Sequence, residues 1–276
     1  MAEDILELYP DSGRRHALHG LYLEQSLAHA DDAGRPFIYS NFIASLDGRI
    51  ALPGANRDTH QVPPAIANAR DWRLFQELAA QADLLITSAR YFRQAASQEA
   101  QAELPLGSSP EFADLRDWRV ARDLSPQPDI AIFSASLDIP QSALDYYRER
   151  KLFLVTGAAA DPAKLAQLTA DSDLKVITCG PQAAVDATHL REQLAGLGYR
   201  RIYAIAGPSV LHTLAAGGAL DRLYHTTAHC LLGGTEFDTF IWGNELQPAV
   251  NLPLQAMYLD PLAPDGAGQT LAIYGS

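Results

Sequence analysis

The alternation of short apolar runs with amphipathic segments from Phe37 onward restricts the possible folds of this chain most. Runs of this length are typical of buried strands, and the segments between them have helical periodicity. The apolar runs are 37–44, 84–87, 130–133, 152–155, 176–178, 202–206, 220–230, 255–259 and 270–274. Helices are predicted over 64–80, 163–168, 189–196 and 210–217. The pattern predicts an α/β fold with a mostly parallel central sheet and helices on both faces.

The two ends of the chain depart from this alternation. The last two apolar runs flank the Pro- and Gly-rich segment 261–268, which predicts an antiparallel pair at the C-terminal edge of the sheet. Residues 1–35 have apolar side chains at near-helical spacing before a breaker at 31–36, so we expect an N-terminal arm with one helix and a main domain over 36–276. The segment 94–128 is the least regular and is interpreted as a long loop or an inserted helix.

Charge and cysteine content exclude several classes of protein. The chain has 33 acidic and 21 basic side chains, a formal charge of -12, which disfavours nucleic acid and anionic membranes as partners but permits a small phosphorylated ligand held by local arginines. Cys179 and Cys230 lack metal-site spacing, and no apolar run approaches the roughly 20 residues of a membrane span. Acidic residues stand in 1–10 where a signal peptide needs basic ones, so a cytoplasmic protein is expected.

A candidate phosphate-binding turn follows the apolar run that begins at Ile202. The run stops at Gly207-Pro208, and a helix is predicted to restart through Ser209, Val210 and Leu211. Glycine lets a ligand approach the backbone, proline suits the first helical turn, and the exposed amides of a helix start can bind phosphate. An ordinary strand-to-helix turn is the alternative interpretation, and this feature alone does not exclude it.

Two other predicted strands end in small polar residues. Ser88 and Arg90 follow the run 84–87, and Ser134 follows 130–133. Hydroxyls, amides and a guanidinium at the carboxyl ends of neighbouring strands fit a dinucleotide lying across a sheet, although serine after a strand is also common turn chemistry.

The segment from Asn41 to Ala51 begins as a strand, passes through Ile43 and Ser45, and breaks at Asp47-Gly48. A hairpin with a charged tip is the alternative here. Asn56 and Arg57 follow on a polar loop that could close over a ligand. No metal site is expected, because His225 and His229 fall in a predicted strand and no glutamate follows the first histidine, unlike in the helical zinc-binding motif.

Taken together, these segments resemble the reductase, or C-terminal, domain family of the riboflavin-biosynthesis deaminase/reductase, which has a dihydrofolate-reductase-like fold. The resemblance extends over roughly 37–276. The matching stretches, in the same order, are Ala44-Ser-Leu-Asp-Gly-Arg-Ile-Ala51, the unit 74–88, Ala206-Gly-Pro-Ser-Val-Leu211, Ala219-Leu-Asp-Arg-Leu-Tyr224 and Leu231-Leu-Gly-Gly234. Weaker similarity to dihydrofolate reductase itself lies in Leu223-Tyr-His-Thr-Thr227 and in 234–240.

The resemblance implies an NADPH-dependent oxidoreductase, dimeric as members of that family often are. It places the turn from Gly207 to Leu211 on the cofactor pyrophosphate, Ile43 and Ser45 near the nicotinamide and Ser134 near the adenosine. It also implies a small polar heterocycle as substrate, a pyrimidine or a pterin, near Asn41, Asn56 and Arg57. Reduction in that family converts the ribose of a phosphoribosylamino-pyrimidine to a ribityl chain, with the hydride chemistry supplied by the cofactor.

The departures from the family pattern concern mainly the substrate. Asn41 stands where the family has a lysine, Ala95-Ala96-Ser97 stands for its Asp-Asp-Pro, and Ile205 replaces an acidic residue. The zinc deaminase signatures are absent from the sequence. The alternatives are a non-catalytic NADPH-binding or regulatory protein on the same fold, and a transferase that uses its helix N-termini for a sugar phosphate. No residue stands out in the sequence as a general acid.

Overall fold

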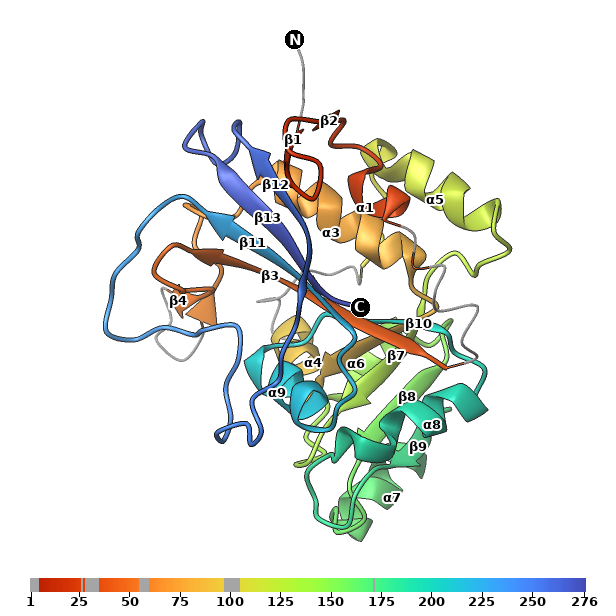
Figure 1. Ribbon diagram of the computed structural model, residues 1–276. Coiled ribbons are helices and arrows are strands. Elements are labelled where there is room, and N and C mark those ends of the chain that lie inside the picture. The colour runs from red at the N-terminus through yellow and green to blue at the C-terminus, as the bar shows by residue number, and fades with distance from the viewer. Residues whose placement is uncertain (1–4, 26, 28–34, 55–59, 97–104, 171) are drawn as a thin grey trace. The chain divides into compact units, whose positions relative to one another are not determined.

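The computed structural model describes residues 5–25, 27, 35–54, 60–96, 105–170 and 172–276. The chain divides into two compact units (Figure 1). Unit 1 contains 1–26, 39–78 and 221–276, and unit 2 contains 27–38 and 79–220. The chain passes between them after residue 26, inside β3 (Phe37–Ser45), inside α3 (Ala69–Gln81) and just before β11 (Arg222–Ala228).

Unit 2 is built on parallel strands. Their order is β10 (Arg201–Ala204), β6 (Leu84–Ser88), β7 (Asp129–Phe133), β8 (Leu152–Thr156) and β9 (Lys175–Thr178). Every pairing between these neighbours is parallel. Parallel strands need long crossover connections, and here helices supply them. The carboxyl ends of all these strands therefore share one edge of unit 2.

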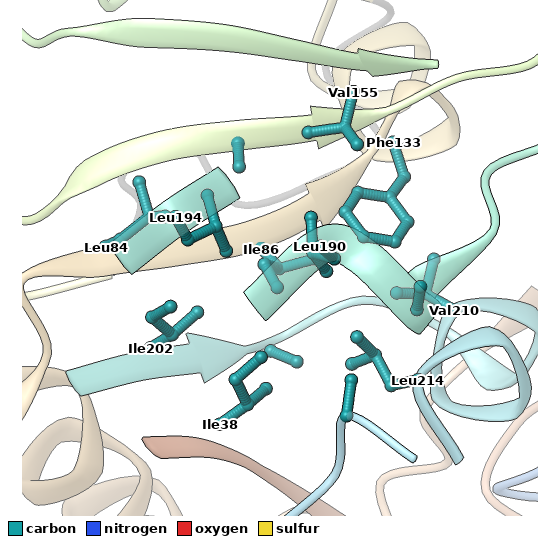
Figure 2. Close-up of a cluster of buried hydrophobic side chains, with 14 of the residues drawn as sticks. Ile38, Leu84, Ile86, Phe133, Val155, Leu190, Leu194, Ile202, Val210 and Leu214 are labelled. Carbon is teal, nitrogen blue, oxygen red and sulfur yellow. The ribbon is translucent and has the colours of Figure 1, made fainter. Parts of the chain in front are cut away.

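Both faces of β6, β7, β8 and β10 are largely buried, which explains the apolar runs in their sequences, whereas the edge strand β9 is mostly exposed. On one face Ile86, Phe133 and Val155 pack against α8 (Leu190–Gly196) and α9 (Pro208–Ala216), as Figure 2 shows. Strand residues of the opposite parity, such as Leu85 and Ile132, are also fully buried. The remaining helices of unit 2 are α4 (Ala89–Ala96), α5 (Ala113–Val120), α6 (Gln141–Tyr146) and α7 (Pro162–Ala170). Short 3-10 turns precede α5 and α8, at Pro110–Phe112 and Ala187–His189.

Unit 1 is mostly antiparallel. Its strand order is β2 (Arg15–His16), β1 (Ile5–Tyr9), β12 (Leu254–Asp260), β13 (Gln269–Gly275), β11 and β3. Among the pairings of these strands, that of β11 with β3 is parallel and the other four are antiparallel. A separate small ribbon joins β4 (Leu52–Pro53) to β5 (His60–Gln61). The antiparallel C-terminal edge predicted from the sequence is confirmed.

A buried carboxylate fixes the N-terminal segment to helix α3. Glu77 accepts hydrogen bonds from the backbone N–H of Gly20 at 2.6 Å and of Tyr22 at 2.9 Å, and from Arg73 Nε at 3.0 Å. Burial raises the pKa of Glu77, and these donors oppose that rise. The one-turn helix α1 (Leu21–Glu24) is therefore held where a short isolated helix would not form.

The structure differs from the sequence-based expectations at several boundaries. The N-terminal arm contains the strands β1 and β2 in addition to a helix. Helix α3 begins at Ala69 and not at residue 64, because Asn68 Oδ1 accepts from the N–H of Arg70 and Asp71 and so starts the helix there. Helices α4 and α6 were not predicted, and the inserted helix expected within 94–128 is α5.

Candidate functional site

Three predicted ligand-contacting segments lie at the same edge of unit 2. β6 lies between β10 and β7, and Ser88 is paired in register with Phe133, directly before Ser134. The turn at Gly207 follows β10, whose last residue is paired with Ile86. The structure thus brings together Ser88, Ser134 and the Gly207 turn, as a dinucleotide across the strand ends requires.

Gly207 is the N-cap of α9 and has ordinary extended geometry, with φ −69° and ψ −177°. A Cβ atom added to it would meet no atom within 4 Å. Neither backbone conformation nor crowding by the described part of the protein therefore requires glycine at this position. Pro208 is the first helical residue, and the N–H groups of Gly207 and Ser209 donate to no acceptor within the described chain. The turn leaves room for a ligand beside unused donors.

Val210 and Leu211 can contribute to ligand binding only through their backbone atoms. Both side chains are buried, and Val210 points into the core cluster (Figure 2). Their N–H groups donate to the carbonyl of Gly207 at 3.0 and 3.3 Å. These two hydrogen bonds and the buried side chains hold the start of α9 in place. Its solvent-facing side consists of Gly207, Pro208 and Ser209.

The side chains near the other two strand ends differ in their availability. Ser134 is buried, and its hydroxyl accepts from the N–H of Leu137 at 2.9 Å. Arg93 donates to the carbonyl of Asp138 at 2.8 Å. Arg90 is exposed at the start of α4, and it makes no hydrogen bond or ion pair with any described residue. The guanidinium of Arg90 is therefore not engaged by the described part of the protein.

In unit 1, β3 directs the predicted residues Asn41, Ile43 and Ser45 to a single face. These residues pair in register with Tyr224, Thr226 and Ala228 of β11, so the two sets of side chains share that face. The face is the one that carries α3, because the Tyr39 hydroxyl, two residues before Asn41, donates to the carbonyl of Leu78 at 2.7 Å.

The Ser-Leu-Asp-Gly segment forms a clamp on the loop after β11. Asp47 accepts from Ser45 Oγ at 2.5 Å and from the N–H of Leu232 and Gly233 at 3.2 and 2.8 Å. These bonds, with the Ser45 hydroxyl first, lower the pKa of Asp47 to about 2. Arg49 adds an ion pair to Asp47 at 3.2 Å. The charged turn around Asp47 therefore positions the loop after β11, and the Ser45 hydroxyl is already hydrogen-bonded to Asp47.

Asp71 is a candidate functional residue that the sequence did not reveal. It lies in the first turn of α3, partly exposed, and its Oδ1 accepts from Thr226 Oγ1 at 2.7 Å. Burial raises the pKa of Asp71 to about 6, and the Thr226 hydroxyl opposes the rise. Phe75 is also partly exposed and lies one helical turn further along the same face. Its ring stacks on the ring of Trp72, with the two ring centroids 4.7 Å apart. A carboxyl that titrates near neutrality beside an aromatic ring suits a polar heterocycle.

The remaining predictions from the sequence concern Asn56, Arg57, metal-binding side chains and membrane-spanning helices. Asn56 and Arg57 lie outside the described residues. No group of three potential metal-binding side chains occurs among the residues that the structure describes. Within that same part of the chain, none of the helices has the length and apolar character needed to cross a membrane.

The comparison with protein families decides the relationship. The model of the RibD C-terminal domain matches residues 36–260. The chain belongs to the RibD C-terminal domain family. A comparison with curated proteins found no match.

Solved structures of RibD-like proteins share the fold at low sequence identity. A pyrimidine reductase-like protein from Corynebacterium diphtheriae superposes with a TM-score of 0.67 at 17% identity, covering 94% of this chain and 98% of that one. RibD from Acinetobacter baumannii gives 0.59 at 16% identity over 92% of this chain, which spans only 62% of that protein. The riboflavin biosynthesis reductase Rib7 of Saccharomyces cerevisiae gives 0.52 at 14% identity, covering 93% and 98%. The predicted fold class and family resemblance are confirmed.

Proposed function

We propose that this RibD-family chain is an NADPH-dependent reductase that acts on a pyrimidine, a pterin or a similar polar heterocycle. The observation that carries the proposal is the open position at Gly207, where neither the backbone nor its surroundings require glycine. A glycine without a structural reason is explained by a group that must come close to the backbone, and a phosphate at a helix start is such a group.

The remaining unit 2 residues support a dinucleotide in the same region. Ser88 and Ser134 lie on neighbouring parallel strands next to this turn, and Arg90 is exposed at the start of α4. A guanidinium that meets the ribose 2′-phosphate contributes roughly 1.5 to 3 kcal/mol, which is about tenfold or more in affinity for NADPH over NADH. When bound, the nicotinamide supplies the hydride, and the protein's part is to bind and orient.

Substrate recognition is assigned to the β3 and α3 face of unit 1. Asp71 in its charged form accepts N–H groups from an amino-substituted ring, and in its protonated form it donates a proton. Its pKa of about 6 makes both forms accessible near neutral pH. Asn41 and Ile43 lie on the same face of β3 and join it as candidate substrate and nicotinamide contacts. A homodimer is expected for this family and is part of the proposal.

The second candidate function is NADPH binding without catalysis. The observation that favours it is the loss of family substrate groups at Asn41 and Ile205. Such a protein would keep the Gly207 turn and Arg90 but turn over no heterocycle.

Titration with NADPH and NADH, followed by an assay against pyrimidine and pterin substrates, tests the proposal. The native protein should bind NADPH at least about tenfold more tightly, and Arg90→Gln should remove most of that preference. Arg148→Gln, which removes an exposed charge after α6, is the matched control and should retain the preference. Equal affinity for both cofactors would refute the NADPH assignment, and tight NADPH binding without turnover across the panel would favour the second function.

A further inference from the structure

A small cationic pocket lies at the amino ends of β7 and β8, the strand edge opposite to the candidate cofactor turns of unit 2. Its volume is about 250 Å³. The lining residues are Leu106, Ser108, Arg116, Gln127, Tyr146, Tyr147 and Arg150. Sites for drug-sized ligands occupy roughly 300–1,000 Å³, so this pocket suits a smaller molecule.

The lining is positively charged in a protein that is acidic as a whole. Two guanidinium groups face the pocket, and none of its lining side chains is a carboxylate. The neighbouring Asp129 attracts Arg150, but its carboxylate accepts from the Tyr199 hydroxyl at 2.6 Å and from the N–H of Lys151 at 3.0 Å and does not line the pocket. The chain's formal charge of -12 makes a concentration of cations without an acidic wall unusual here.

Arg116 is held in place by contacts that leave its binding edge available. Nη1 donates to the carbonyls of Gly107 at 2.6 Å and Ser109 at 3.0 Å. Nε and Nη2 donate to no acceptor within the described part of the chain. The Nε–Nη2 edge of a guanidinium is the fork that binds the two oxygens of a carboxylate or phosphate.

Arg150 places a second charge where water solvates it poorly. Its Nε donates to the carbonyl of Pro128 at 2.6 Å, and its guanidinium lies 5.6 Å from the centre of the Tyr147 ring. Burial lowers the pKa of Arg150 to about 10. An anion beside it would compensate for the lost solvation and strengthen any charge-assisted hydrogen bond there.

We propose that this pocket, which we call the Arg116 pocket, binds a small oxyanion, the carboxylate or phosphate group of a compact metabolite. Arg116 supplies the two-pronged contact, Arg150 the second charge, and the Tyr146 and Tyr147 rings the apolar wall. The site is independent of the proposed reductase chemistry, since its residues lie at the opposite edge of the unit 2 strands.

Calorimetric titration of the full chain with inorganic phosphate and, separately, with malonate tests the proposal at constant ionic strength in chloride-free buffer. Saturable binding of at least one anion is expected, and the preferred anion distinguishes a phosphate source from a carboxylate source. Arg116→Gln should weaken that binding at least about tenfold, since it removes two charge-assisted hydrogen bonds. Arg116→Lys, which keeps the charge without the fork, should weaken it by a smaller factor.

Two controls separate this site from others. Arg122→Gln removes the same charge from an exposed arginine that stacks on Trp118 just after α5, and it should leave anion binding unchanged. Gly207→Val, which alters the candidate cofactor turn, should retain the component of anion binding that Arg116→Gln weakens. Absence of saturable binding, an equal loss in Arg122→Gln, or a loss in Gly207→Val with retention in Arg116→Gln would each overturn the proposal. None of these results depends on whether the protein reduces any substrate.

Discussion

The charged form of Asp71 destabilises the folded protein, so this effect depends on pH. Its pKa is raised from 3.8 to about 6, so the folded state takes up a proton more readily than the unfolded chain does. Stability from this group is therefore fully present below about pH 4 and is lost as the pH rises through about 6. With roughly 1.4 kcal/mol per pKa unit, the loss is at most about 3 kcal/mol.

Asp71→Asn should remove this dependence. The amide oxygen can still accept from Thr226, but nothing titrates, so the variant should gain stability over the native protein between about pH 4 and 6.5 and keep a constant advantage above. Chemical denaturation across this pH range measures the difference. Asp173→Asn, at an exposed position, is the control and should leave the curve unchanged. Parallel curves for Asp71→Asn and the native protein would contradict the assigned pKa.

Gly207→Val separates a ligand role from a structural one. The backbone geometry at Gly207 is open to any residue and its surroundings are empty, so the melting temperature should change little. Its two methyl groups would occupy the space assigned to the phosphate, and NADPH affinity should fall at least about tenfold. Gly196→Val, at the exposed end of α8 with equally open surroundings, should bind NADPH normally. Normal binding by Gly207→Val would leave the turn with a structural role only.

At the level of single residues, the sequence predicted local backbone structure better than contacts between side chains that lie far apart in the chain. Pro208 suits the first turn of a helix, so the start of α9 was predictable. Asp71 was not, because its partner Thr226 is 155 positions away and an acidic residue in a first helical turn has an ordinary explanation as a helix-stabilising charge. Only the pairing of β11 with β3 and the placement of α3 on that face make the carboxyl noteworthy.

Among the structural elements, the β3 turn and the loop after β11 depend on one carboxylate. Asp47→Asn would keep one acceptor but lose the ion pair with Arg49 and one of the bonds to the loop. Amide hydrogen exchange at Leu232 and Gly233 should then become faster, while the strands keep their protection. Asp145→Asn, in the exposed helix α6, is the matched control. Unchanged exchange at both amides would show that the clamp does not order the loop.

The same clamp has a defined acid limit. Because the pKa of Asp47 is depressed to about 2, its stabilising contribution is present above about pH 4 and is lost as the pH falls towards 2. The contact therefore remains intact throughout the range in which Asp71 titrates, so the two effects can be measured separately.

Strands that are buried on both faces could be predicted from the sequence. Elements that form through partners distant in the sequence could not. The inner strands β6, β7 and β8 each contain a buried apolar run, and these runs appear directly in the sequence. β1 has a single charged residue, Glu7, and no regular alternation, and it is ordered as a strand by pairing with the distant β12, for instance Leu6 with Leu259. Helix α4 follows β6 without a break, so its start carried no turn signal that the sequence could reveal.

For the whole molecule, we predict weak activity in the riboflavin-pathway reduction despite the family membership. Asn41, Ala95 and Ile205 stand where the family pattern has groups that can hold a charged substrate, and each lost charge-assisted hydrogen bond costs about 1.5 to 3 kcal/mol. Two such losses would lower kcat/KM by several orders of magnitude if they add. An assay with the phosphoribosylamino-pyrimidine and NADPH measures this directly. A kcat/KM at or above about 10⁴ M⁻¹s⁻¹ would contradict the prediction and assign the chain to that reaction.

The segmented composition of unit 1 also matters while the protein is being made. Unit 2 draws almost entirely on the stretch 79–220, whereas unit 1 needs 221–276 to join segments translated long before. At 5–20 residues per second, Leu6 waits roughly 12 to 50 s for its partner Leu259 to be translated. During that interval β1 can pair with the two-residue β2 but lacks β12 on its other side, and α3 lacks β11 beside β3. A ribosome that stalls between residues 221 and 253 therefore leaves a nascent chain that has all of unit 2 but whose β1 lacks its β12 partner, which is a substrate for chaperones and proteases.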